Sequence, residues 1–583
     1  MLVYRDASVA ERAAALADEV ESLAAAVEAK PGYDAAIELL VTAGELEAAV
    51  LDTLECADED AIGAALRDIT ASAARVLVAA NEPATGRCAS LCGKLRSLVH
   101  TVRVAVADLL VRRRVPEGYA YYALYPEAYA TAARVYWAER RPRMVTVIGI
   151  RSIGTSLSAV VATELARCDS GLDLQTLTVR PTGHPFDRVL ALTREAERLV
   201  RARVFGEFVV VDEGPGLSGS SFAAVADALS MVGVSEKRIS FMPSWLPAPE
   251  QLRSERARSH WSRHRAYTST FDAVWDAGRG IAEQWDAEIV ADWSGGCWRD
   301  AHDDDSIPAV NAQHEQRKYL VRRGDELLVL KFAGLGRYGR RRAALSETLA
   351  DAGYAPAVHG FHCGFLATAF VAGTRLTQHT LDRESLAHIG AYVAFRGSLE
   401  VARRGASLAD LREMIETNVA DEIGHFPRAR ELLSRVEEQT RGERAVANDA
   451  RMLAHEWIKA SSGLTKIDGV AHHDDHFLPG PQPVVWDIAG ARAELELGAD
   501  ESRVLLEAFA ANAANGHEPE LEQRLPFYDV AYLALRIGYA SMSAESCAAS
   551  SDGPRWVRAE SRYRERLRSV LASMEQSALP CVV

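Results

Sequence analysis

The segment VVVDEGPGLSGSSF (residues 209–222) joins an apolar run to a helix-like run through two adjacent acids and a Gly/Ser loop. Such an apolar run is typical of a strand buried on both faces. The loop from Gly214 to Ser221 can turn backbone N–H groups toward a phosphate, and the following helix adds its positive end. Asp212 and Glu213, at the strand's carboxyl end, suit vicinal ribose hydroxyls or a magnesium-bound sugar. The segment therefore predicts a sugar-phosphate site.

Strands and helices alternate around this segment. The predicted strands cover 144–150, 174–180, 206–213 and 237–243, and the predicted helices cover 156–167 and 220–233. This alternation predicts a doubly wound parallel sheet, in which ligands bind beyond the carboxyl ends of the strands. A generic nucleotide-type strand–loop–helix is the alternative interpretation of the same pattern.

The strand, acid pair and serine loop resemble the motif of type I phosphoribosyltransferases, which bind phosphoribosyl pyrophosphate (PRPP). The resemblance implies that Asp212 and Glu213 are catalytic and bind ribose hydroxyls. It implies that the 5′-phosphate is held by Gly216, Ser218, Gly219, Ser220 and Ser221. The loop is one residue longer than the common form and contains Pro215, which leaves the role of each loop residue open.

Two other turns match the order of that family. GIRSIGTS (149–156) takes the place of the pyrophosphate loop, with Arg151, Ser152, Gly154 and Thr155 as expected ligands. RPTGHPFDR (180–188) takes the place of the mobile loop, where Arg180, His184 and Arg188 would neutralise the departing pyrophosphate. An ordinary exposed loop is the alternative for each of these turns.

The C-terminal half resembles aminoglycoside phosphotransferases and choline kinases. ELLVLKF places Lys331 on the second arm of a hairpin, as the family's phosphate-contacting lysine lies, and Glu347 is expected to pair with it from the next helix. FLATAFVAGTRL (365–376) has the pattern of the strand that links the two lobes. The resemblance implies that these residues bind ATP.

The same resemblance implies a catalytic loop at AHHDDHFLPG (471–480). His473 and Asp475 have His-x-Asp spacing, so Asp475 would accept a proton and contact the metal, and Asp487 would hold magnesium. The sequence departs from the family pattern, because Gly480 stands where a metal-binding Asn is expected and no Gly-rich loop precedes Lys331. The register His472/Asp474, or a metal site formed by residues 472–476, remains open.

Length and composition agree with several domains of an ordinary globular chain. The chain has 583 residues, a formal charge of −15 and eight scattered cysteines, so nucleic acid is a poor partner and free thiols in a cytoplasmic protein are expected. No apolar run approaches the length of a membrane span, and the first residues lack a signal core. Ser8 and Glu11 have capping-box spacing, which predicts a helix start.

The sequence thus predicts a multidomain α/β protein. Its expected parts are a helical accessory or oligomerising region (1–115), a phosphoribosyltransferase-like domain (116–250), a connector (251–312) and a bilobal kinase-like domain (313–583, with lobes 313–376 and 377–583). Residues 117–130, 212–221 and 291–300 add a resemblance to phosphoribosyltransferases associated with bacterial tellurite-resistance and stress systems.

The expected function is that of a magnesium-dependent enzyme that uses PRPP to make or modify a nucleoside-like metabolite. A nucleobase-like acceptor would be its second substrate, and the fused kinase-like domain would use ATP. The alternative is a PRPP or nucleotide sensor with a degenerate kinase-like domain.

Overall fold

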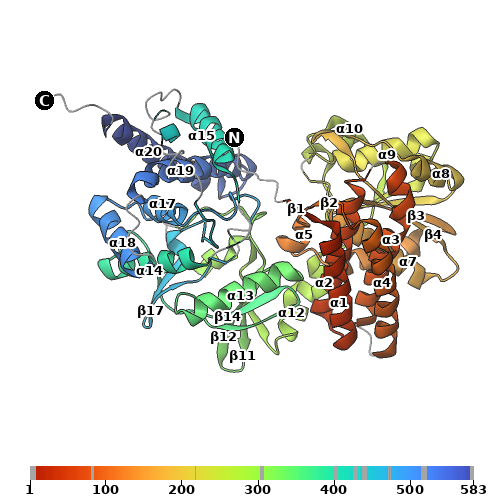
Figure 1. The fold of residues 1–583 in the computed structure, drawn as a ribbon, viewed down its shortest axis with the longest axis horizontal. Coiled ribbons are helices and arrows are strands. Elements are labelled where there is room, and N and C mark those ends of the chain that lie inside the picture. The colour runs from red at the N-terminus through yellow and green to blue at the C-terminus, as the bar shows by residue number, and fades with distance from the viewer. Residues whose placement is uncertain are drawn as a thin grey trace.

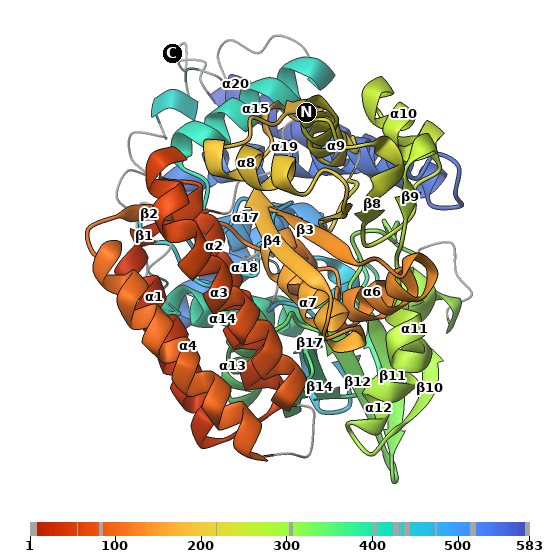
Figure 2. The same ribbon diagram turned by 90° about the vertical axis from the view of Figure 1, so that its right-hand side faces the viewer.

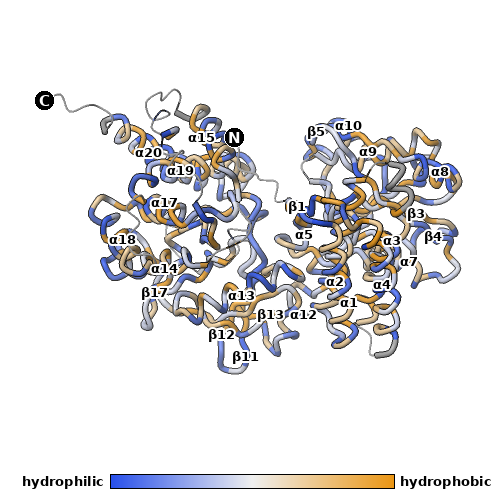
Figure 3. The backbone as a smooth tube through the Cα atoms, in the orientation of Figure 1, coloured by the Kyte–Doolittle hydropathy of each residue, from blue (hydrophilic) through white to orange (hydrophobic). Residues whose placement is uncertain are grey.

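The protein forms two halves that pack side by side in the computed structural model (Figure 1). The structure describes residues 8–54, 56–80, 85–216, 218–301, 307–399, 401, 405–423, 431, 433–435, 443–470, 472, 475–513 and 521–577. No helix among these residues is both long enough and apolar enough to span a membrane. Hydropathy changes repeatedly along the helices (Figure 3), as expected for helices with one buried and one exposed face.

Four long helices follow the short strand β1 and stand next to one another along one flank of the first half (Figure 2). They are α1 (Ala13–Ala29), α2 (Tyr33–Leu51), α3 (Cys56–Ala80) and α4 (Thr85–Ala105). The predicted helix start at Ser8 is wrong, because β1 (Val9–Arg12) pairs antiparallel with β2 (Leu110–Arg113). The capping pattern is therefore overridden by a strand partner about a hundred residues away.

The parallel sheet follows as the sequence predicted. Its strands and helices are β3 (Met144–Ile150), α7 (Ile153–Cys168), β4 (Asp173–Val179), α8 (Arg194–Ala202), β7 (Glu207–Val211), α9 (Ser220–Val232), β8 (Ile239–Met242) and β9 (Arg265–Ala266). The strand order is β4-β3-β7-β8-β9, and all pairs are parallel. A small antiparallel hairpin, β5 (Thr182–His184) and β6 (Asp187–Val189), interrupts the chain after β4.

Two helices precede this sheet, namely α5 (Glu117–Ala120) and α6 (Pro126–Arg140). The segment expected to be a connector belongs to both halves instead. It contributes β9 to the parallel sheet and β10 (Glu288–Asp292) to the second sheet. Its remaining elements are α10 (Glu255–Arg263), α11 (Phe271–Trp275), η3 (Asp276–Gly278), α12 (Arg279–Glu283) and η4 (Ser294–Ala301). Two short helical turns come before it, namely η1 (Glu236–Arg238) and η2 (Pro249–Gln251).

The second half begins with an antiparallel sheet of order β10-β11-β12-β14-β13. The predicted hairpin is confirmed as β11 (Lys318–Arg323) and β12 (Glu326–Phe332), and α13 (Arg337–Asp351), β13 (Val358–His362) and β14 (Phe365–Ala369) follow it. A second small sheet contains β15 (Thr374–Arg375), β16 (Trp457–Ala460) and β17 (Gly463–Lys466). The helices are α14 (Arg383–Ser398), α15 (Leu408–Ile423), α17 (Val485–Glu494), α18 (Ala499–Asn512), α19 (Leu521–Ser546) and α20 (Gly553–Ser577), with η5 (Ala454–Glu456) before β16.

One apolar core continues from the N-terminal helices through the parallel sheet into the antiparallel sheet, and Leu16, Val147 and Leu330 are all fully buried in it. Buried charges join the same elements. Glu45 on α2 accepts hydrogen bonds from Arg113 (2.6 Å) and from Arg337 of α13 (2.8 Å), and Tyr338 donates its hydroxyl to it (2.6 Å). The antiparallel sheet is thereby fixed to the helical region.

We predict that Glu45→Ala destabilises the protein by about 3–5 kcal/mol, because two guanidinium groups would lose their buried counter-ion. Glu28→Ala, which removes an exposed partner of Arg96 in the same helical region, should change stability by less than about 1 kcal/mol. Urea unfolding followed by tryptophan fluorescence measures both variants. Equal stabilities of the two variants would contradict the role given to Glu45.

Candidate functional site

The central contact of the second half joins its two lobes. Lys331 lies on β12, and its Nζ donates to Asp468 Oδ1 at 2.5 Å. Asp468 comes two residues after the end of β17, so the lysine belongs to the antiparallel sheet and the carboxylate to the helical lobe. Burial alone would raise the pKa of Asp468, but the nearby Lys331, His472 and Lys318 hold it well below its usual range. Burial lowers the pKa of Lys331.

A pocket surrounds this ion pair. Its charged lining is Glu315, Lys318, Lys331, Arg451, Asp468, His472, Asp475 and His476. Its aromatic lining is Tyr121, Tyr122, His314 and Phe477. Three cations and three carboxylates thus face one space, and the aromatic rings lie around the His476 and Phe477 side of it.

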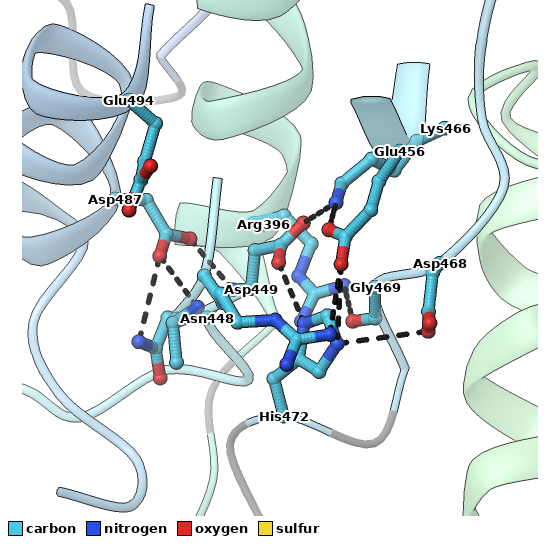
Figure 4. Close-up of polar contacts among 12 residues, drawn as sticks. Arg396, Asn448, Asp449, Glu456, Lys466, Asp468, Gly469, His472, Asp487 and Glu494 are labelled. Carbon is cyan, nitrogen blue, oxygen red and sulfur yellow. Dashed lines mark hydrogen bonds and ion pairs between the residues drawn. The ribbon is translucent and has the colours of Figure 1, made fainter. Parts of the chain in front are cut away.

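The loop before β16 holds its acids in buried ion pairs (Figure 4). Asp449 is fully buried and lies 3.2 Å from Lys466 Nζ, while Tyr392 donates its hydroxyl to it at 2.7 Å. Burial raises the pKa of Asp449, but Lys466 and His472 outweigh that effect and lower it. Glu456 accepts from Lys466 at 2.5 Å and from Arg451 at 2.8 Å. Of this loop, Arg451 is the residue that lines the pocket.

Asp487 does not have the surroundings expected of a metal ligand. The apolar run before it begins α17 instead of a strand, and Asp487 is fully buried. Its carboxylate accepts the backbone N–H groups of Asp449 (2.7 Å) and Ala450 (2.8 Å), as Figure 4 shows. Burial and the neighbouring Asp449 raise the pKa of Asp487 to about 6. Asp487 therefore fixes the loop from within the helical lobe.

The expected pair between Lys331 and Glu347 does not form. Glu347 lies on the exposed face of α13, whereas Arg342 and Ser346 take the buried face of that helix. Lys331 is bound to Asp468 instead. Spacing along the chain suggested that Glu347 would face Lys331, but it does not determine which face of α13 is buried.

Asp475 lines the pocket as expected and accepts the backbone N–H of Phe477 at 2.8 Å. Its proposed neighbour His473 and the alternative Asp474 lie outside the described residues. Gly480 has a φ of 80°, a conformation that favours glycine, so this position serves a turn of the backbone and does not line the pocket around Lys331. His472 is buried and contacts Asp449 through Nδ1 at 3.1 Å.

The acid pair of the parallel sheet lies where the sequence placed it, at the carboxyl end of β7. Glu213 Oε2 accepts the backbone N–H of Gly118 at 3.0 Å, and Tyr129 donates its hydroxyl to the backbone carbonyl of Asp212 at 2.8 Å. Gly154 comes so close that an added Cβ would lie 3.0 Å from Asp212 Oδ1. Burial raises the pKa of Asp212 to about 7 and that of Glu213 to about 8.

The serine loop is covered by the small hairpin. Ser220 is buried, and its hydroxyl donates to the backbone carbonyl of Pro185 at 2.7 Å. The Oγ atoms of Ser218 and Ser220 lie 3.0 Å apart. Gly216 and Gly219 adopt left-handed conformations, while Ser221 lies in the first turn of α9. The phosphate-binding role expected for Ser220 would require the hairpin to release this hydroxyl.

The other expected anion ligands separate into two groups. Arg151 is buried, donates to the carbonyls of Leu51 and Thr178, and so has a structural position instead of the ligand-facing one expected. Thr155 is buried as well. Ser152 and Arg180 line a second pocket beside the acids, whereas His184 is exposed on the hairpin. Burial and the nearby Arg180 lower the pKa of Arg188, the last member of the set.

One short segment touches both sites. Gly118 contacts Glu213, and the carbonyls of Tyr119 and Ala120 accept bonds from Leu335 (2.8 Å) and Arg342 (2.7 Å) of the second half. Tyr122 then reaches His476 Nε2 with its hydroxyl at 3.0 Å. The segment around α5 therefore contacts residues of both sites.

Sequence reasoning missed Asp468, Lys318, Arg451 and the tyrosines of the first half. The signal for Asp468 was available in WIKASSGLTKIDG (457–469), two short β-rich runs around a Gly-containing turn that end in an acid. The contributions of Tyr121 and Tyr122 had no local signal, because they come from a segment about 350 residues before His476.

No protein-family model and no curated protein matches the chain. Among solved structures, the choline kinase LicA from Streptococcus pneumoniae is similar with a TM-score of 0.31 and 15% identity, over 43% of this chain and 89% of that chain. A choline/ethanolamine kinase family protein from Mesorhizobium loti gives 0.32 and 16%, over 44% and 90%. Macrolide 2′-phosphotransferase MphH from Brachybacterium faecium gives 0.31 and 14%, over 49% and 98%. Similarities this distant assign no function to the chain.

We predict that stability falls as pH rises from about 5 to about 8 and then levels off, because the folded state keeps protons on Asp212 and Glu213 that the unfolded chain has lost. The double variant Asp212→Asn/Glu213→Gln should show a smaller fall over this window. Thermal unfolding at a series of pH values measures both proteins. Identical pH profiles would contradict the raised pKa values.

Proposed function

We propose that the C-terminal half binds magnesium–ATP in a cleft of the small-molecule phosphotransferase type. The observation that carries the proposal is the Lys331–Asp468 pair between a sheet lobe and a helical lobe. Kinases use a strand lysine for the nucleotide phosphates and an Asp from the other lobe for magnesium. The proposal assigns these two tasks to Lys331 and Asp468.

The residues of the pocket fit the metal and the nucleotide. Asp468, Glu315 and Asp475 offer carboxylate oxygens, which are the ligands that Mg²⁺ prefers, and Asp468 is the residue proposed to hold it. Lys318, Lys331 and Arg451 offer positive charge to phosphate oxygens. Bound magnesium would neutralise charge on the phosphates, while the lysines hold the chain of phosphates in place.

A second candidate is nucleotide binding without transfer, and the loop before β16 favours it. In protein kinases the loop with the catalytic Asp precedes the metal-binding Asp along the chain. Here the described part of that loop gives the pocket Arg451, while Asp449 and Glu456 are bound to Lys466. Asp475, the expected base, comes after Asp468. If transfer occurs, Asp475 is the described carboxylate placed to accept a hydroxyl proton, since it is half-buried in the pocket.

For the parallel sheet we propose a site for a magnesium-bound ribose phosphate of the PRPP class, acting in a glycosyl transfer to a nucleobase-like acceptor. Asp212 and Glu213 supply the sugar contacts in this proposal, and the loop around Ser218 supplies the phosphate contacts. The hairpin β5–β6 lies over that loop, as a cover that excludes water would. The specific support is the convergence of the acid pair, the serine loop and Arg180 at one edge of a parallel sheet.

We predict that Lys331→Met and Asp468→Asn each weaken binding of magnesium–ATP at least about tenfold, because each removes a charged contact to the phosphates or the metal. Lys459→Met serves as the control, since Lys459 is an exposed lysine of the same lobe that pairs with Asp382. Isothermal titration calorimetry measures the affinities. Unchanged affinity in both variants would refute the cleft. ADP formation that Asp475→Asn abolishes would favour transfer, and tight binding without turnover would favour the second candidate.

For the sheet site, Asp212→Asn/Glu213→Gln should weaken binding of PRPP at least about tenfold in the presence of magnesium, because two contacts to the charged sugar complex are lost. Asp169→Asn, an exposed residue after the last turn of α7 at the opposite edge of the sheet, serves as the control and should bind PRPP like the wild type. Equilibrium binding of labelled PRPP distinguishes them. Equal binding by the acid-pair variant and the control would rule out the proposed sugar contacts.

A further inference from the structure

The hairpin turn between β13 and β14 carries a cysteine. His362 pairs with Phe365 across the hairpin, so Cys363 and Gly364 form the two-residue turn between the strands. Both turn residues have positive φ angles, 50° for Cys363 and 79° for Gly364. A turn with positive φ at both positions favours Asn or Asp before the glycine, because other side chains rarely adopt this conformation. Turn geometry therefore does not explain why a cysteine stands here.

Two residues of the first half hold this turn in place. Asp34 lies in the first turn of α2, and its Oδ2 is 2.6 Å from Nδ1 of His362. Its Oδ1 accepts the backbone N–H of Cys363 at 2.9 Å. Tyr125 donates its hydroxyl to the carbonyl of Cys363 at 2.5 Å. A carboxylate, an imidazole and a thiol are thereby brought together from the two halves, and the Cys363 side chain is only 2% exposed.

The three side chains are close enough to share one metal ion. A ligand atom of each of Asp34, His362 and Cys363 lies within 4.8 Å of those of the other two. A tetrahedral zinc site has bonds of about 2.0–2.3 Å, which separate its ligand atoms by roughly 3–4 Å. Small side-chain rotations would therefore place all three ligand atoms on one ion. The Asp34–His362 contact alone would be an ordinary ion pair, but it would give no role to the buried thiol beside it.

The charges around the thiol favour a cation. Burial raises the pKa of the Cys363 thiol, and the negative charges of Asp34 and Glu127 add to this effect. Among the residues that the structure describes, no lysine or arginine forms an ion pair with either acid. Asp34 contacts His362, and Glu127 accepts the hydroxyl of Tyr33 at 3.3 Å. A divalent cation would supply the charge that balances the two carboxylates.

We propose that Asp34, His362 and Cys363 bind a zinc ion that fastens the N-terminal helical region to the antiparallel sheet. Oxygen, nitrogen and sulfur ligands together indicate zinc, because magnesium and calcium prefer oxygen ligands alone. On binding, the Cys363 thiol releases its proton to solvent and the thiolate bonds to the ion, while neutral His362 gives a nitrogen lone pair and Asp34 a carboxylate oxygen. A water molecule takes the fourth position. None of the three residues lines either pocket described above, so the inference is independent of both proposed ligand sites.

Cobalt substitution tests the inference with a signal that a thiolate ligand gives and carboxylates do not. Protein stripped with a chelator and loaded with Co²⁺ should show a thiolate-to-cobalt charge-transfer band. Cys363→Ser should lose this band. It should also bind zinc at least about tenfold more weakly in competition with a chromogenic chelator, since even changes beside a zinc ligand cost about that much. Cys297→Ser, which alters an exposed cysteine outside the cluster, serves as the control and should keep both the band and the affinity.

The wild-type spectrum alone can overturn the inference, whether or not any variant folds. A wild type loaded with Co²⁺ that lacks the charge-transfer band leaves Asp34 and His362 as an ordinary ion pair between the halves. A band that persists in Cys363→Ser also overturns the inference, because another cysteine would then be the ligand. A band that disappears in Cys363→Ser, together with weaker zinc binding by His362→Ala, supports it when circular dichroism shows both variants to be folded.

Discussion

The cleft of the second half depends on a single ion pair, Lys331 with Asp468. The two residues are separated by 137 positions in the chain and belong to different lobes. Taking both charges out of water is costly, and such a pair is a weak source of net stability compared with apolar packing. In the function proposed above, Lys331 would contact phosphates and Asp468 would hold a metal ion. Lys318 and Glu315 repeat the same combination in the same pocket at 2.8 Å.

Polar contacts cross between the two halves. Glu45 joins the helical region to α13, and Asp34 binds both His362 (2.6 Å) and the backbone of Cys363 (2.9 Å). The segment around α5 contacts residues of both sites. The helical region, which carries no catalytic motif in its sequence, lines one of the two pockets.

The sequence predicted the parts of the fold whose signals are local. Periodicity placed β3, β4, β7 and the hairpin β11–β12 within a few residues, and the acid pair lies at the strand end as expected. Prediction from the sequence failed where the environment of a residue depends on partners that are distant in the chain. Asp487 follows an apolar run, which in the sequence resembles the position of a metal ligand. In the structure its carboxylate oxygens accept hydrogen bonds from the backbone N–H groups of Asp449 and Ala450.

Helix phase and packing between distant elements explain the other differences from the sequence predictions. Glu347 has suitable spacing from Lys331, yet α13 turns it to the solvent. Arg151 follows the first strand of the sheet, yet its guanidinium is used to fix Leu51 at the end of α2. Neither outcome can be derived from a single sequence, because each depends on which element packs on the other side. Asp468 could have been found, since a β-rich pair of runs precedes it.

The most direct test of the account is the number of metal ions that the cleft holds together with nucleotide. Electron paramagnetic resonance with Mn²⁺ in place of Mg²⁺ counts bound metal with and without ATP. We expect ATP to increase tight Mn²⁺ binding to the wild type and to folded Asp487→Asn, and we expect Asp468→Asn to abolish this increase. An ATP-dependent increase that persists in Asp468→Asn would show that Asp468 does not hold the metal.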